Sequence, residues 1–104
     1  MKYLTTAMLA SLMCSAAVAV AAPDGAQLYT EKTCNACHGP KGDKPLLPMY
    51  PKISGQNAAY TEQQMKDIKS GARSNGQTAA MKGVMHLVND EEIKALSLYL
   101  EKLK

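Results

Sequence analysis

Two cysteines and a histidine are the residues of this sequence whose types and spacing suit chemistry at a shared site. Cys34, Cys37 and His38 lie in the segment CNACHG, so two thiols stand three residues apart and an imidazole directly follows the second. Three kinds of site use such side chains at such spacing: a dithiol/disulfide redox centre, a zinc site and a covalently attached haem. The rest of the chain must decide among them.

The remainder of the sequence favours covalent haem. A thioredoxin-type centre needs a strand-rich βαβ scaffold, and the sequence predicts no such strands. A closed zinc site needs four ligands, and beyond the cluster and the amino-terminal Cys14, for which we expect no chemical role, the chain offers only His86. On a helical turn, thiols at positions i and i+3 share one side and can form thioethers with two vinyl groups of one porphyrin. His38 would then reach the iron.

The composition indicates one small domain with few large apolar side chains. The chain has 104 residues, no Trp, no Phe and five Tyr. A core of this kind is marginal without assistance, and a haem tethered at two points would supply a large apolar disc. The formal net charge of +3 is small, and the charges are interspersed along the chain. This pattern argues against nucleic acid as a partner.

The amino-terminal stretch, residues 1–21, is typical of a secretory signal peptide. It has Lys2 near its start, then an apolar run without charges, and the A-x-A pattern at 19–21. We therefore expect cleavage before Ala22, a mature domain of residues 22–104 and a location in the periplasm. The apolar run is short for a membrane span, so we expect no stable membrane insertion after cleavage. An uncleaved anchor is the alternative.

Helix signals predict an all-α fold of three to four helices. Asp24, with Gln27 three residues later, resembles a capping box that opens a helix over about 25–32. This helix leads directly into the two cysteines and the histidine. A further helix is expected over 57–70, where apolar residues recur at helical spacing and Gly71 supplies a stop.

The last helix and the loop in the middle of the chain are also visible in the sequence. Asn89 and Glu92 form a second capping-box pattern. The segment 39–56 holds four Pro and three Gly, which predicts an ordered loop without helix or strand. The last helix should present one apolar stripe, made of Ile93, Leu96, Leu100 and Leu103.

The sixth ligand of the iron separates an electron carrier from a ligand-binding or peroxidase-like haem protein. A methionine is more often core filler than ligand, so each candidate has a plain packing interpretation. Met81 lies in a segment of small residues, where a loop could cover the distal face of the haem. Met85 and His86 are close enough in sequence to compete with it. The candidates after the cysteines are Met49, Met65, Met81, Met85 and His86.

The mature chain resembles the small monohaem His/Met cytochromes c of bacteria, known as class I. It is most similar to the cytochrome c-553 type and to one half of the dihaem cytochrome c-4 type. The matching segments, in order, are CNACHG at 34–39, YPKISGQ at 50–56, QMKDIKSG at 64–71 and MKGVMHLVNDEEIKALSLYL at 81–100.

This resemblance implies a small cytochrome c fold wrapped around one covalent haem c, with His38 and Met81 as the axial ligands. Met85 becomes the runner-up to Met81. Pro51 matches the residue whose carbonyl accepts a hydrogen bond from the axial histidine, and Ile53 would pack on the haem. The first and last helices are expected to cross at four residues: Gly25, Tyr29, Leu96 and Tyr99.

The resemblance also implies a function without catalysis. The protein would shuttle single electrons from a quinol-oxidising cytochrome complex to a terminal oxidase or reductase, as a monomer and not as an enzyme. Two alternatives stay open: a haem-based sensor of small ligands or weak peroxidase, and an electron-transfer subunit of a larger redox complex.

Overall fold

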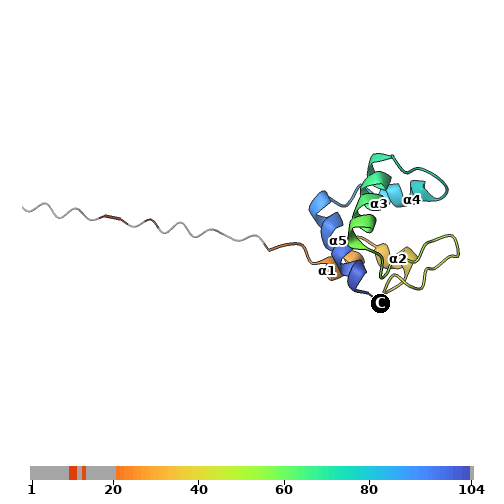
Figure 1. Cartoon of the computed structure of the whole chain (residues 1–104), viewed down its shortest axis with the longest axis horizontal. Coiled ribbons are helices and arrows are strands. Elements are labelled where there is room, and N and C mark those ends of the chain that lie inside the picture. The colour runs from red at the N-terminus through yellow and green to blue at the C-terminus, as the bar shows by residue number, and fades with distance from the viewer. Residues whose placement is uncertain (1–9, 12, 14–20, 104) are drawn as a thin grey trace, which may run out of the picture.

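Helices account for all the regular secondary structure in the described part of the chain. The computed structural model (Figure 1) describes residues 10, 11, 13 and 21–103. The predicted signal peptide, residues 1–21, therefore lies almost wholly outside the described residues. The all-α prediction is confirmed, with one helix more than the three to four expected. The helices are α1 (Gly25–Glu31), α2 (Cys34–His38), α3 (Ala58–Ser70), α4 (Thr78–Met85) and α5 (Asp90–Lys102).

The helices pack in the order α2, α1, α5, α3, α4. Helix α5 contacts both α1 and α3, while α2 packs against α1 and α4 packs against α3. Figure 1 shows the consequence, because α2 and α4 lie at the two ends of this series, on the side of the molecule away from the amino-terminal segment. Helices α2 and α4 therefore do not pack against each other and lie on either side of a space.

Local capping explains where α1 and α5 begin. The carboxylate of Asp24 accepts hydrogen bonds from two backbone N–H groups in the first turn of α1. The side chain of Gln27 bonds to the carboxylate at the end of α1 instead of reaching back, so the capping box predicted there is half formed. At α5 the box is complete. Asn89 Oδ1 accepts from the backbone N–H of Glu92 at 2.8 Å, and the Glu92 carboxylate accepts from the N–H of Asn89 at 3.0 Å.

Helix α3 begins and ends on residues suited to those places. The side chain of Asn57 accepts from the backbone N–H of Ala59 at 3.0 Å. Gly71 ends the helix with a φ of 90°, a left-handed conformation that glycine adopts without steric cost. The predicted extent of this helix, 57–70, agrees with the structure once Asn57 is assigned as the cap.

Helices α1 and α5 cross in close contact at a glycine. A Cβ atom added to Gly25 would lie 2.6 Å from the Cβ of Tyr99 and would press on the carbonyl oxygen of Ala95. The rings of Tyr29 and Tyr99 meet beside this point, with centroids 5.8 Å apart and planes tilted by 55°. The crossing that the resemblance implies is present for Gly25, Tyr29 and Tyr99.

The segment around Met81 is helical, which corrects the expectation of a loop over the distal face. Helix α4 carries Met81 in its interior, although Gly83 is an unfavourable helix residue. Its amino-terminal cap residue, Gln77, makes no side-chain capping bond. The sequence contains few signals for this helix, and packing against α3 supplies much of what its capping and composition lack.

The apolar core lies between α1, α3 and α5 and extends under the turn after α4. The predicted stripe of α5 takes part through Ile93, Leu96 and Leu100, and Leu103 packs against its edge. No helix among the described residues has the length and apolar character needed to cross a bilayer. The buried apolar residues are Leu28, Tyr29, Met65, Ile68, Met85, Val88, Ile93, Leu96 and Leu100.

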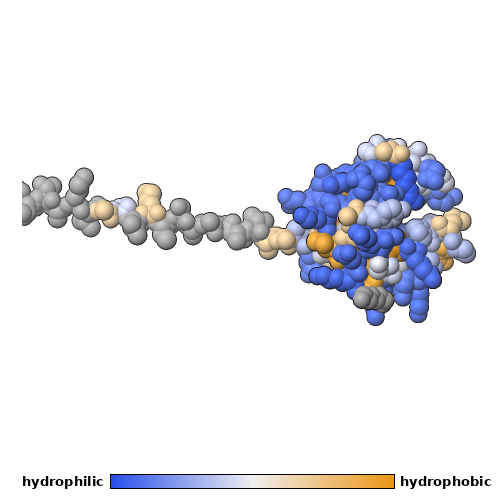
Figure 2. All heavy atoms as spheres, in the orientation of Figure 1, coloured by the Kyte–Doolittle hydropathy of each residue, from blue (hydrophilic) through white to orange (hydrophobic). Residues whose placement is uncertain are grey.

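The segment 39–56 is a loop fixed by backbone bonds, as predicted. The N–H of Leu46 donates to the carbonyl oxygen of Cys37 at 2.9 Å, and the N–H of Ile53 donates to that of Gly42 at 2.8 Å. Figure 2 shows apolar side chains at the outer edge of the molecule where this loop lies. Leu46 is 70% exposed there, and Met49 is 58% exposed. This loop brings apolar surface close to the cysteine motif.

Candidate functional site

Helix α2 holds the two cysteines and the histidine in a single short turn. Its cap residue, Thr33, has a φ of 64°, a conformation that costs energy for a residue with a branched side chain. Both cysteine thiols are free. Cys37 and His38 line a cavity described below, and Cys34 packs against the core. Burial raises the pKa of the Cys34 thiol to about 11, so the unmodified thiol is protonated at neutral pH.

The ring of His38 is held by the loop that follows α2. Its Nδ1 lies 2.8 Å from the carbonyl oxygen of Pro51. A carbonyl oxygen can only accept, so Nδ1 carries the proton and the lone pair is on Nε2. No buried side-chain nitrogen or oxygen lacks a partner in the described part of the chain. His38 is 6% exposed and lines the cavity, which leaves Nε2 free to bind a metal there.

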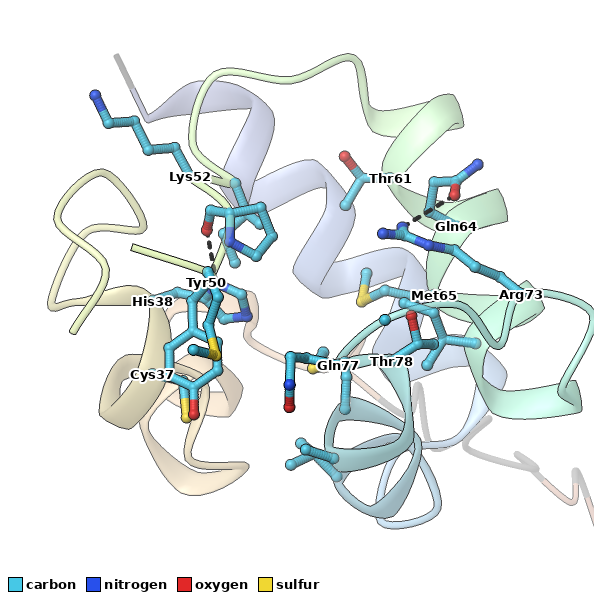
Figure 3. Close-up of a pocket in the computed structure, with 18 of the residues that line it drawn as sticks. Cys37, His38, Tyr50, Lys52, Thr61, Gln64, Met65, Arg73, Gln77 and Thr78 are labelled. Carbon is cyan, nitrogen blue, oxygen red and sulfur yellow. Dashed lines mark hydrogen bonds between the residues drawn. The ribbon is translucent and has the colours of Figure 1, made fainter. Parts of the chain in front are cut away.

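One cavity of about 550 Å³ lies between α2 and α4. Its volume falls within the range of roughly 300–1,000 Å³ that organic ligands and cofactors occupy in proteins. Pro51 and Ile53 from the loop, Met81 from α4 and Leu100 from α5 all line it. Figure 3 shows the open space, with Cys37, His38 and Tyr50 on one side and Met65, Gln77 and Thr78 on the other.

Of the four methionines that follow the cysteine motif, three line the cavity and one does not. Met81 is half-buried and lines the cavity from α4. Met85, one turn later, is 1% exposed, belongs to the core cluster and is absent from the cavity wall. Met49 and Met65 also line the cavity, from the loop and from α3. This geometry favours Met81 over Met85, and the axial role of Met81 stays a prediction.

A tyrosine hydroxyl supports the end of α2. The hydroxyl of Tyr29 donates to the carbonyl oxygen of Gly39, the residue that follows His38, at 2.5 Å. A buried tyrosine hydroxyl needs a hydrogen-bond partner, and this bond supplies it. Burial is the main cause that raises the pKa of Tyr29 to about 12. Tyr29 therefore links α1 to the turn that carries the site.

Several polar residues of the cavity wall had no signal in the sequence. The guanidinium of Arg73 donates to the side-chain oxygen of Gln64 at 3.1 Å, and both residues line the cavity. Thr78, at the start of α4, is also part of the wall. Arg73 is the only arginine of the chain, which is the one feature that could have singled it out.

The comparison with known families decides what this site is. Residues 22–104 match the family described as cytochrome c. The chain belongs to the cytochrome c family. Its site is therefore one for haem c, the cofactor that the family binds covalently.

This cytochrome c is similar to bacterial relatives of two sizes. It is 42% identical over 71 residues to cytochrome c4 of Stutzerimonas stutzeri, covering 67% of this chain and 34% of the relative. It is 34% identical over 85 residues to cytochrome c-553 of Nitratidesulfovibrio vulgaris, covering 82% of this chain and 81% of the relative. This cytochrome c thus spans about a third of one relative and most of the other.

A solved structure supports the fold of this cytochrome c. The crystal structure of reduced recombinant cytochrome c4 from Pseudomonas stutzeri superposes with a TM-score of 0.68 at 36% sequence identity. The match covers 77% of this chain and 46% of that chain. The prediction of a class I cytochrome c fold is therefore confirmed.

The residues that line the cavity fit a covalent haem. The wall offers a thiol and an imidazole nitrogen with a free lone pair from α2, and a thioether from α4. Imidazole with thioether is a known pair of haem ligands, and cysteines at this spacing with a following histidine are the attachment motif. The second thiol, Cys34, lies one helical turn before Cys37. Cys34, Cys37, His38 and Met81 are thus the residues that would hold the group.

Proposed function

We propose that this cytochrome c is an exported electron carrier with a closed iron site, ligated by His38 and Met81. The observation that carries the proposal is that these two side chains line one cavity from the two helices on either side of it. When bound, the haem supplies a single site for one electron. A pair of ligands that stays in place in both oxidation states favours fast electron transfer over ligand binding.

The surrounding residues orient the histidine and exclude water. Nδ1 of His38 donates a hydrogen bond to the carbonyl oxygen of Pro51, with 2.8 Å between the two atoms, which fixes the ring and makes Nε2 a better ligand for iron. Ile53 and Ile68 add apolar surface to the same cavity. The apolar part of the wall disfavours the additional positive charge of the oxidised state. These residues would raise the reduction potential relative to an open, wet site.

The proposed partners are redox proteins that meet the molecule beside Cys37. The donor would be a quinol-oxidising cytochrome complex in the periplasm, and the acceptor a terminal oxidase or reductase. Lys41, Lys44 and Lys52 are exposed on the loop that follows the cysteine motif, so acidic surfaces on such partners would be attracted. The rate of electron exchange with a purified partner should then fall as salt rises. A rate that ignores ionic strength would contradict this steering.

A matched pair of variants tests the iron ligands. Met81→Leu removes the thioether from the cavity wall, and Met85→Leu removes one from the core with little change of volume. We expect the far-red absorption band of a thioether–iron bond in oxidised wild type and in Met85→Leu, and its loss in Met81→Leu. Retention of the band in Met81→Leu, with loss in Met85→Leu, would assign the ligand to Met85. A high-spin wild type that readily binds carbon monoxide would favour the small-ligand sensor or weak peroxidase.

A second candidate is an electron-transfer subunit that works beside another redox domain. The similarity to a relative about three times as long as the matched segment favours it. Light scattering of the purified holoprotein distinguishes the two, because the free carrier should have the mass of one chain plus haem. Release of the domain into the periplasmic fraction, and its retention in the cytoplasm after deletion of residues 1–21, would support export.

A further inference from the structure

Helix α4 has few local features that stabilise it, although Met85 anchors its last turn in the core. It has eight residues, and isolated helices shorter than about 12–15 residues are marginal in water. Gly83 lies inside it, and Gln77 gives no side-chain cap. Among the helices of residues 21–103, α4 packs against α3 alone. The helix that carries Met81 therefore depends on what secures its ends.

Two lysines secure the carboxyl end of α4. Lys32, the cap residue of α1, donates from Nζ to the carbonyl oxygen of Leu87 at 2.9 Å. Lys69, in the last turn of α3, donates from Nζ to the carbonyl oxygen of Val88 at 2.5 Å. These two carbonyls are consecutive and follow α4 within three residues. Two cations at the negative end of a helix dipole also stabilise it electrostatically.

The ammonium group of Lys32 also forms an ion pair with a residue at the start of α5. Its Nζ lies 3.5 Å from one carboxylate oxygen of Glu92, and the other oxygen accepts the capping bond from the N–H of Asn89. The segment 86–89 is thus fixed to α1, α3 and α5. Hydrogen bonds with a charged donor are about twice as strong as neutral ones.

We propose that Lys32 and Lys69 are positioning residues that hold α4, and with it Met81, against the haem cavity. This rests on the proposed function, in which Met81 is the sixth ligand. Without the ammonium groups, the end of α4 detaches more often, and the thioether leaves the cavity wall with it. The buried side chains of Met85 and Val88 keep the turn attached to the core, so the effect is local and not global.

Lys69→Met and Lys32→Met test the proposal, because methionine keeps an apolar side chain of similar length and loses the charged donor. The matched control is Lys66→Met. Lys66 lies one turn earlier on α3, and its ammonium group forms a partly exposed ion pair with Glu62 at 3.2 Å. Imidazole is the probe, since it binds the iron when the thioether leaves. Its apparent affinity for the oxidised holoprotein should rise about three- to tenfold in Lys69→Met and Lys32→Met. It should match wild type in Lys66→Met and recover in Lys69→Arg.

Hydrogen exchange gives a readout that does not depend on which residue ligates the iron. Backbone amides of residues 82–88 should exchange faster in Lys69→Met and Lys32→Met, while the amides of α5 keep their wild-type protection. Unchanged exchange at 82–88, or an equal effect of Lys66→Met, would overturn the proposal. Faster exchange there without any change in imidazole affinity would overturn the link to Met81. Failure of the proposed function shows separately, as a far-red band that survives Met81→Leu.

Discussion

The crossing of α1 and α5 makes Gly25→Ala a sensitive perturbation. The added Cβ would lie 2.6 Å from the Cβ of Tyr99, below the 3.0 Å that real Cβ atoms keep, and would also press on the carbonyl oxygen of Ala95. One of these neighbours is backbone and the other is the rigid start of a side chain. Neither can rotate away, so the helices must separate.

The size of the effect follows from two opposing terms. Overpacking of a close contact costs about 1–3 kcal/mol. Replacing glycine by alanine in a helix gains at most about 1 kcal/mol, and less at the first helical residue, where Gly25 lies. The net loss should be about 2 kcal/mol. For a domain of this size, such a loss lowers Tm by roughly 8–16 °C.

The assay is urea unfolding of the holoprotein followed by far-ultraviolet circular dichroism, with Gly83→Ala as the control. Gly83 lies inside α4, and a Cβ added there meets no atom within 4 Å. The same chemical change should therefore stabilise the protein at this position, by up to about 1 kcal/mol. Opposite signs for the two variants are expected. A Gly25→Ala protein as stable as wild type would refute the close crossing.

Three further predictions concern a buried hydroxyl, a helix cap and the attachment of the haem. Tyr29→Phe should lower the free energy of unfolding by about 1 kcal/mol, because the buried hydrogen bond from its hydroxyl to the carbonyl oxygen of Gly39 disappears. The loss is no larger because that oxygen still accepts a bond from the N–H of Gly42. Tyrosine in the unfolded chain ionises near pH 10, whereas burial raises the pKa of Tyr29 in the folded protein to about 12. The difference in unfolding free energy between wild type and Tyr29→Phe should therefore be largest below pH 10 and should shrink between pH 10 and 12. A pH-independent difference would contradict the pKa. Asn89→Ala should cost about 1 kcal/mol, measured by thermal unfolding, since it removes the complete capping box; an unchanged Tm would contradict this. The double variant Cys34→Ser and Cys37→Ser cannot attach haem, so a cavity of about 550 Å³ is left without its apolar filling. This variant should lose cooperative unfolding in urea. A sharp transition would argue against a structural role for the haem.

Local signals made α1, α3 and α5 predictable, and the absence of such signals hid α4. Asp24, Asn57 and Asn89 cap their helices with their own side chains, and a contact of this kind is visible within four residues of sequence. Helix α4 has no such cap, contains Gly83 and is held by α3 and by lysines distant in the chain. Tertiary contacts decide its conformation, so a reading of its own residues suggested a loop.

The candidate site divides in the same way. The cysteine motif is contiguous, and the resemblance placed Pro51 beside His38, where the structure has its carbonyl at 2.8 Å from Nδ1. The wall formed by Gln64, Arg73 and Thr78 comes from three separate segments with no spacing rule among them. Met65 shows a further limit. Its helical spacing predicted core packing, and it both packs in the core and lines the cavity.

The pairing of α1 with α5 joins the first helix of the domain to the last, and this has a consequence for biosynthesis. Leu28 and Tyr29 of α1 have no core to enter until the final helix has left the ribosome. Contacts so distant in sequence form slowly and late. A nascent chain of this design cannot complete its core before α5 is made, so both thiols stay accessible for attachment of the haem until then.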